Sequence, residues 1–207
     1  LTCSTQTATV VDTALNVSTA IAIGNDTFPV VAYLELNTGH LKVAKCINAS
    51  CTGSSTLTIV DPNGTNGRNP SIKVPADGLP VISYWDESNN QLKVAKCGNA
   101  SCSASNVLTT VDTRVGTGQY SSIAIAADGF PIISYYDSTD QDLRIAKCGN
   151  AACSSGNAVF IADSFGSVGT YTSIAIGLDG NPIVAYFDAG PQYVKTLKCS
   201  TPTCALP

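Results

Sequence analysis

Residues 121–137, SSIAIAADGFPIISYYD, decide the fold of this chain. Residues 122–125 alternate large and small side chains, and residues 131–136 are rich in β-branched and aromatic types, so both segments are expected to form strands. Asp128-Gly129 between them suits a tight turn, because both residue types tolerate a positive φ. The stretch therefore predicts a β-hairpin.

The same stretch is written four times along the chain. The copies begin at Ser18, Pro70, Ser121 and Thr172. Their prolines are Pro29, Pro80, Pro131 and Pro182, and the cysteines of the loop that follows are Cys46 and Cys51, Cys97 and Cys102, Cys148 and Cys153, Cys199 and Cys204. The proline series and both cysteine series advance by 51 residues at every step. A fixed period of about 50 residues indicates a propeller or a solenoid.

Each unit contains two further expected strands, at residues 143–148 and 158–161 of the third copy, and helical periodicity is absent. Four antiparallel strands per repeat describe a propeller blade. The sequence thus predicts an all-β fold: a β-propeller with four blades of four antiparallel strands and one disulfide in each blade.

The two ends of the chain predict how this ring closes. Residues 1–12, LTCSTQTATVVD, match the end of a unit, and the last unit stops at residues 204–207, before its fourth strand. We expect one domain, 1–207, in which residues 1–12 supply the closing strand of the last blade. The expected blades are 13–63, 64–114, 115–165 and 166–207. The alternative passes the first strand to a neighbouring molecule.

The unit SIAIAADGFPIISYYD…LRIAKCGNAAC resembles a blade repeat of secreted, mostly uncharacterised bacterial proteins. The resemblance covers essentially the whole chain. It implies a propeller in a secreted protein and says little about activity.

Composition narrows the class of protein. Of the 207 residues, 44% are hydrophobic and 13% charged, with a net charge of −4, which argues for a folded chain and against a nucleic-acid partner. No apolar run approaches the roughly 20 residues of a membrane span. Nine cysteines and no Met favour an oxidising compartment and a removed signal segment. We therefore expect a secreted protein, extracellular or at the cell surface.

The cysteine loops have three possible roles: zinc sites, redox motifs or disulfides. Zinc needs four ligands, usually as two close pairs, and His40 is the one histidine. A redox motif has a shorter spacing beside a helix. Disulfides across each loop fit both spacing and compartment, and they leave Cys3 over, either for an intermolecular bond or as a thiol without a role.

Other repeated side chains have structural explanations. The hairpin-turn acids are Asp77, Asp128 and Asp179 with Asp26 near the same place, and the strand-end acids are Asp86, Asp137 and Asp188 with Glu35. We expect turn formation from them rather than catalysis. The aromatic pairs are Tyr84-Trp85, Tyr135-Tyr136 and Tyr186-Phe187, with Tyr33-Leu34 in the first unit. Packing between blades explains these pairs, and a sugar shelf in each groove between blades is the functional alternative.

His40 is expected at the surface. The sequence has no nucleophile motif with which it could form a catalytic triad. In sialidase propellers, three arginines clamp a carboxylate. The three arginines of this chain do not occupy equivalent repeat positions, so the resemblance to such a clamp is weak; they are Arg68, Arg114 and Arg144. Possible glycosylation sites are Asn16, Asn25, Asn48, Asn63 and Asn99.

We therefore expect a non-enzymatic structural propeller that self-assembles into an extracellular oligomer or filament. No catalytic residue, cofactor or metal site is predicted. A lectin with one weak site per blade, and less favoured a sialidase-like glycoside hydrolase, are the alternatives. Expected partners are copies of the chain itself or glycans.

Overall fold

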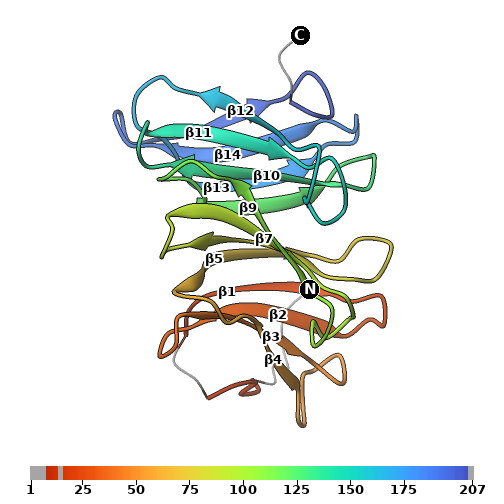
Figure 1. The fold of residues 1–207 in the computed structure, drawn as a ribbon. Helices are drawn as coiled ribbons and strands as arrows, with labels where there is room; N and C mark the ends of the chain where they lie inside the picture. The colour runs from red at the N-terminus through yellow and green to blue at the C-terminus, as the bar shows by residue number, and fades with distance from the viewer. Residues whose placement is uncertain (1–7, 14–15, 205–207) are drawn as a thin grey trace.

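The computed structural model describes residues 8–13 and 16–204, and it shows four antiparallel sheets there (Figure 1). The first sheet holds β1 (Asn16–Ile23), β2 (Pro29–Glu35), β3 (His40–Lys45) and β4 (Thr56–Asp61). The second holds β5 (Asn66–Lys73), β6 (Val81–Asp86), β7 (Gln91–Lys96) and β8 (Val107–Asp112). The third holds β9 (Gln119–Ile125), β10 (Pro131–Asp137), β11 (Asp142–Lys147) and β12 (Ala158–Asp163). The fourth holds β13 (Val168–Ile176), β14 (Pro182–Asp188) and β15 (Tyr193–Lys198).

Each sheet is a meander in which consecutive strands pair, so the predicted all-β, antiparallel architecture is confirmed. The predicted turn forms at Asp128-Gly129, where the Phe130 amide donates to Asp128 Oδ1 at 3.0 Å and Gly129 has a φ of 81°. No helix in the described ranges is long and apolar enough to cross a membrane.

The core lies between sheets. One face of each sheet packs on the opposite face of the next: Val81 and Leu92 of the second sheet, for example, cluster with Ile133 and Tyr135 of the third. Equivalent clusters join the first sheet to the second and the third to the fourth. The first strands of the sheets also contact one another in chain order, β1 with β5, β5 with β9 and β9 with β13. We call these four the inner strands.

A buried polar contact accompanies each interface. The carboxylate of Asp61, at the end of β4, accepts from the Tyr84 hydroxyl at 2.8 Å and pairs with Lys93, both in the second sheet. Asp163 pairs in the same way with Tyr186 and Lys195 of the fourth sheet. The end of each sheet is thereby tied to the middle of the next.

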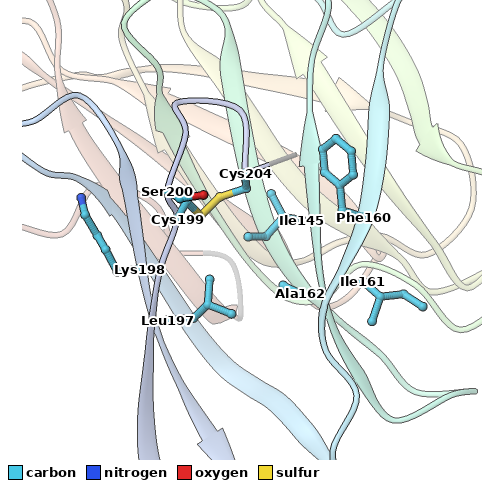
Figure 2. A pocket seen from close by; sticks show the side chains of 9 residues that line it. All are labelled: Ile145, Phe160, Ile161, Ala162, Leu197, Lys198, Cys199, Ser200 and Cys204. Carbon is cyan, nitrogen blue, oxygen red and sulfur yellow. A yellow bond between two sulfur atoms is a disulfide. The ribbon is translucent and has the colours of Figure 1, made fainter. Parts of the chain in front are cut away.

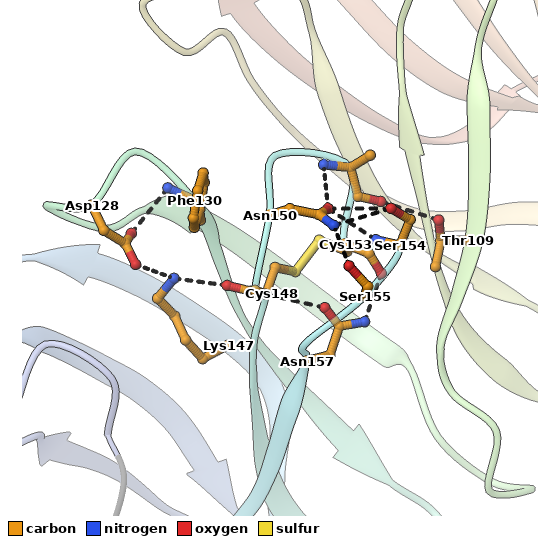
Figure 3. Close-up of a disulfide and its surroundings, with 12 residues drawn as sticks. Thr109, Asp128, Phe130, Lys147, Cys148, Asn150, Cys153, Ser154, Ser155 and Asn157 are labelled. Atoms are coloured by element: carbon orange, nitrogen blue, oxygen red, sulfur yellow. Dashed lines mark hydrogen bonds and ion pairs between the residues drawn. A yellow bond between two sulfur atoms is a disulfide. The ribbon is translucent and has the colours of Figure 1, made fainter.

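The cysteine loops connect the third and fourth strands, and each contains a disulfide: Cys46–Cys51, Cys97–Cys102, Cys148–Cys153 and Cys199–Cys204. Figure 3 shows the loop of the third sheet, in which the Asn150 side chain accepts from the amides of Ala152 and Ser154 at 3.0 Å each. Thr109 of the second sheet donates to the Ala152 carbonyl at 3.1 Å. The loop is thus a rigid part of the interface between sheets.

Removing this disulfide by a Cys148→Ala, Cys153→Ala double substitution should lower the free energy of unfolding by about 2 kcal/mol, the chain-entropy value for so short a loop. Urea unfolding followed by circular dichroism measures it. The Cys199–Cys204 pair is the matched control, because its loop has the same length and the chain-entropy account predicts the same loss there. The two pairs differ in burial, since Cys153 is buried and Cys204 is partly exposed. A loss below 0.5 kcal/mol at either pair would contradict the chain-entropy account.

The described residues do not show the predicted closing strand, which stays a prediction. The fourth sheet has three strands, and residues 8–13 lie outside any sheet; residues 1–7 are outside the described ranges. Asp12 accepts from the Tyr33 hydroxyl at 2.6 Å and from Lys42 at 2.8 Å in the first sheet. Asp61 and Asp163 make the same kind of contact from the paired strands β4 and β12, so this contact holds the segment on the first sheet without deciding whether it pairs with β15. Tyr193 and Val194 of β15 remain 66% and 79% exposed.

Candidate functional site

The most distinctive surface feature lies at the beginning of the inner strands. Two adjoining cavities of about 200 and 300 Å³ open there and share Ser18, Asn69 and Tyr120 in their walls. Tyr171 lines the second cavity, so all four sheets contribute the same repeat position, each 51 residues after the last. Arg68, Trp85 and Gln119 complete the wall of the first cavity. We call these seven residues the inner-strand site.

Backbone irregularities aim three of these side chains. The pairing register shifts next to each of them, between β5 and β6, β9 and β10, and β13 and β14. Asn69, Tyr120 and Tyr171 have φ values of 48°, 54° and 54°. A left-handed conformation costs a tyrosine roughly 1–2 kcal/mol. Bulges of this kind redirect side chains and are common beside functional sites.

The site is rich in aromatic surface. The Tyr120 ring lies 4.5 Å from the Tyr171 ring and 6.4 Å from the Tyr136 ring, measured between centroids. Burial and the neighbouring Tyr171 hydroxyl raise the pKa of Tyr120. Its hydroxyl is therefore protonated at neutral pH and can donate a hydrogen bond to a ligand. Tyr171 is 70% exposed.

Polar groups surround the rings. The Arg68 guanidinium donates through Nε to Glu87 at 2.6 Å, Gln119 donates to the Ser138 hydroxyl at 3.2 Å, and the Trp85 indole donates to the Asn90 side chain at 3.0 Å.

The Ser18 hydroxyl is buried in the wall, and no described residue bonds it. Flat aromatic faces next to amides, hydroxyls and a guanidinium suit a polyhydroxylated ligand, whose ring faces are apolar and whose edges are polar.

A different cavity, of about 170 Å³, lies between the third and fourth sheets (Figure 2). It has a packing origin. Ala162 stands where the other interfaces have Val60 and Val111. The Thr109–Ala152 hydrogen bond of the preceding interface has no counterpart here, because Phe160 replaces the threonine. This cavity is a defect of the repeat rather than a built site.

An Ala162→Val substitution should fill part of that cavity and raise the free energy of unfolding by about 1 kcal/mol, as cavity-filling changes commonly do. Thermal unfolding would show the gain as a higher melting temperature. The reverse change at the equivalent position, Val111→Ala, serves as control and should destabilise. A destabilised Ala162→Val protein would mean that the cavity walls cannot accommodate the added methyl groups.

The residues singled out in the sequence are scattered. The turn acids Asp77, Asp128 and Asp179 each pair with a lysine of the third strand of their own sheet, as does Asp26. The strand-end acids Asp86, Asp137 and Asp188 are buried. None of these acids lines the inner-strand site, and Tyr84 and Tyr135 are buried against the preceding sheet rather than forming a sugar shelf.

The three arginines do not converge. Arg114 and Arg144 meet at Asp140, while Arg68 stands at the inner-strand site. His40 is partly buried, and its Nδ1 has no bonding partner among the described residues.

Among the possible glycosylation sites, Asn48 and Asn99 use their side chains to bond Thr52 and Ser103 within their cysteine loops. Cys3 lies outside the described residues, so its pairing and any self-association through it stay predictions.

Sequence reasoning missed Asn69, Gln119, Tyr120 and Tyr171. A signal was available in NGRN, TGQY and VGTY, where a glycine precedes a bulky or polar residue at one repeat position. Those residues precede the alternating segment, so they read as connections between strands.

No family model and no curated protein matches this sequence. Solved structures do. An α-L-arabinofuranosidase of Clostridium thermocellum is 14% identical, with a TM-score of 0.56 over 89% of this chain and 68% of its own. A GH43 β-1,3-galactosidase is 12% identical, with a TM-score of 0.61 over 90% of this chain and 43% of its own. The NanB sialidase of Streptococcus pneumoniae is 11% identical, with a TM-score of 0.56 over 85% and 28%. At these identities the likeness shows the fold, that of a propeller.

The comparisons contradict one expectation from the sequence. A non-enzymatic, self-assembling structural protein was predicted, yet the three solved structures named above, which share its fold, are glycoside hydrolases. The prediction rested on the regularity of the repeat. That regularity describes the scaffold, whereas function depends on the residues that depart from the repeat.

Proposed function

We propose that this protein is a carbohydrate-active propeller, a single domain whose glycan lies across the inner-strand site. The observation that carries the proposal is the convergence of Trp85, Tyr120 and Tyr171 with side-chain amides in one pair of cavities. Its fold neighbours, which are glycoside hydrolases, support the same class of ligand.

Hydrolysis of a glycosidic bond is the reaction that these neighbours suggest. It needs two carboxyl groups on opposite sides of the bond. No carboxyl group lines the two cavities among the described residues, so the acids would come from the surrounding turns. Glu87 and Asp140 are the candidates, because each lies in the turn between the second and third strands of its sheet and is 34% and 41% exposed.

The compartment in which the protein would meet a glycan follows from its disulfides. Four of them, together with a surface of low charge, support a secreted protein acting outside the cell. The partner in this proposal is thus an extracellular polysaccharide or glycoconjugate.

A panel of plant and bacterial polysaccharides tests the proposal. We expect at least one to quench the fluorescence of Trp85, the single tryptophan, and to release reducing ends on longer incubation. Glu87→Gln and Asp140→Asn variants should reduce release while leaving the quench. Binding without release would overturn the hydrolytic part, and no quench or release with any polysaccharide would overturn the proposal.

A further inference from the structure

The inner-strand site carries one charged side chain among its described lining residues, and that residue is Arg68. The repeat does not require an arginine there, because the equivalent positions of the other units hold Val17, Gln119 and Thr170. All four inner strands form nonetheless. The strand therefore does not need a guanidinium at this position, and Arg68 lines the cavity where a ligand can reach it.

The Arg68 guanidinium is held in one orientation, but only part of its hydrogen-bonding capacity is used. Its Nε donates to Glu87 at 2.6 Å, and the two side chains are 40% and 34% exposed. Neither terminal nitrogen has a bonding partner among the described residues. These two nitrogens form a planar fork whose spacing matches the two oxygens of a carboxylate.

The neighbours of this fork suit a sugar ring. Arg68 is the cross-strand partner of Trp85, so the indole and the guanidinium start from adjacent points of the same cavity. The Asn69 and Gln119 amides line the same cavity and can bond ring hydroxyls. The buried Ser18 hydroxyl is a further polar group in that wall, and none of residues 8–13 and 16–204 bonds it.

We infer that the inner-strand site recognises a sugar residue that bears a carboxylate, with the carboxylate on the terminal nitrogens of Arg68 and the ring on Trp85. The inference rests on the proposed function and names its ligand class, a uronic acid. Because the protein carries a net charge of −4, general attraction does not draw an anion to it. Preference for the acid must therefore arise locally, at Arg68.

Substitution of Glu87 should change the affinity for an acidic sugar in the opposite direction to substitution of Arg68. Its carboxylate orients the guanidinium and also repels an incoming anion. Gln at this position can still accept the bond from Nε without carrying charge, so Glu87→Gln should tighten binding of an acidic sugar. A merely structural role of the Arg68–Glu87 pair predicts no such gain.

The experiment uses tetragalacturonate and its methyl ester, which are the same tetrasaccharide with and without charge. Binding is followed within seconds by Trp85 fluorescence, before any turnover. We expect the wild-type protein to bind the acid at least tenfold more tightly than the ester. Arg68→Gln, which installs the residue found at the equivalent position of the third sheet, should abolish that preference by weakening binding of the acid at least tenfold. Glu87→Gln should bind the acid a few-fold more tightly than wild type.

Each alternative outcome is distinguishable. Equal binding of acid and ester by the wild type, or an acid preference that survives Arg68→Gln, overturns this inference and leaves the proposed function standing. Weaker binding of the acid by Glu87→Gln also counts against it. Absence of a response to either compound and to the whole polysaccharide panel overturns the proposed function itself. Matching thermal unfolding of wild type and Arg68→Gln verifies that the variant is folded.

Discussion

Replacing Asp61 by Ala should lower the free energy of unfolding by about 3–5 kcal/mol, the usual loss when one partner of a buried ion pair is removed. Asp61 is fully buried, and its carboxylate accepts from both Tyr84 and Lys93. The variant leaves the buried Tyr84 hydroxyl and the largely buried Lys93 ammonium without the carboxylate that they bond. Urea unfolding measures the loss.

The fourth sheet supplies a matched control. Asp163 makes the same two contacts, with Tyr186 and Lys195, but the Lys195 side chain is 34% exposed whereas that of Lys93 is 12%. Water can replace the lost carboxylate there, so Asp163→Ala should have a clearly smaller effect. Equal losses at the two sites would show that burial does not govern these contacts.

Stability should also fall in acid. Burial opposes ionisation of Asp61, but the hydrogen bonds from Lys93 and Tyr84 outweigh it and hold its pKa below the ordinary value of 3.8. A carboxyl with a lowered folded pKa stabilises the fold above its unfolded pKa, and that stability is lost as pH falls through the folded value. We expect the free energy of unfolding to decline below about pH 4, and less steeply in Asp61→Asn. A decline that is unchanged in this variant would assign it to other carboxyls.

The scaffold was largely predictable from the sequence because its determinants are local and repeated. The Asp128-Gly129 turn, the alternating strand before it and the cysteine spacing each specify a conformation within a few residues, and the period of 51 shows that they recur. Closure of the ring was not predictable in this way. In each unit the aspartate that ends the last strand bonds the next sheet, so Asp12 meets Tyr33 whether or not its own segment pairs with β15.

The site escaped prediction for the opposite reason, since it consists of departures from the repeat. Tyr120 and Tyr171 enter the cavities because a bulge puts them in a left-handed conformation, which tyrosine rarely adopts. The available signal, a glycine two residues earlier at Gly118 and Gly169, also fits an ordinary connection between strands. Arg68 is distinctive only beside Gln119, its counterpart in the next unit, and not beside the other arginines.

Replacing Trp85 by Ala should weaken glycan binding at least tenfold, or about 1.4 kcal/mol, because a large aromatic anchor in a site of this size usually contributes more than that. Trp85 lines the first cavity beside Arg68 and Gln119. Because the substitution removes the fluorescent reporter, isothermal titration calorimetry measures the affinity.

Two further variants separate stacking from folding. Trp85→Phe places in the second unit the residue that the fourth unit has at Phe187, so it should fold and keep most of the affinity. Phe165→Ala removes an 86% exposed ring that lines neither cavity, and it should bind like wild type. If Trp85→Ala binds as tightly as Phe165→Ala while both remain folded, the glycan does not lie on the indole. The aromatic convergence at the inner strands would then be packing between sheets, as Tyr84 and Tyr135 already are.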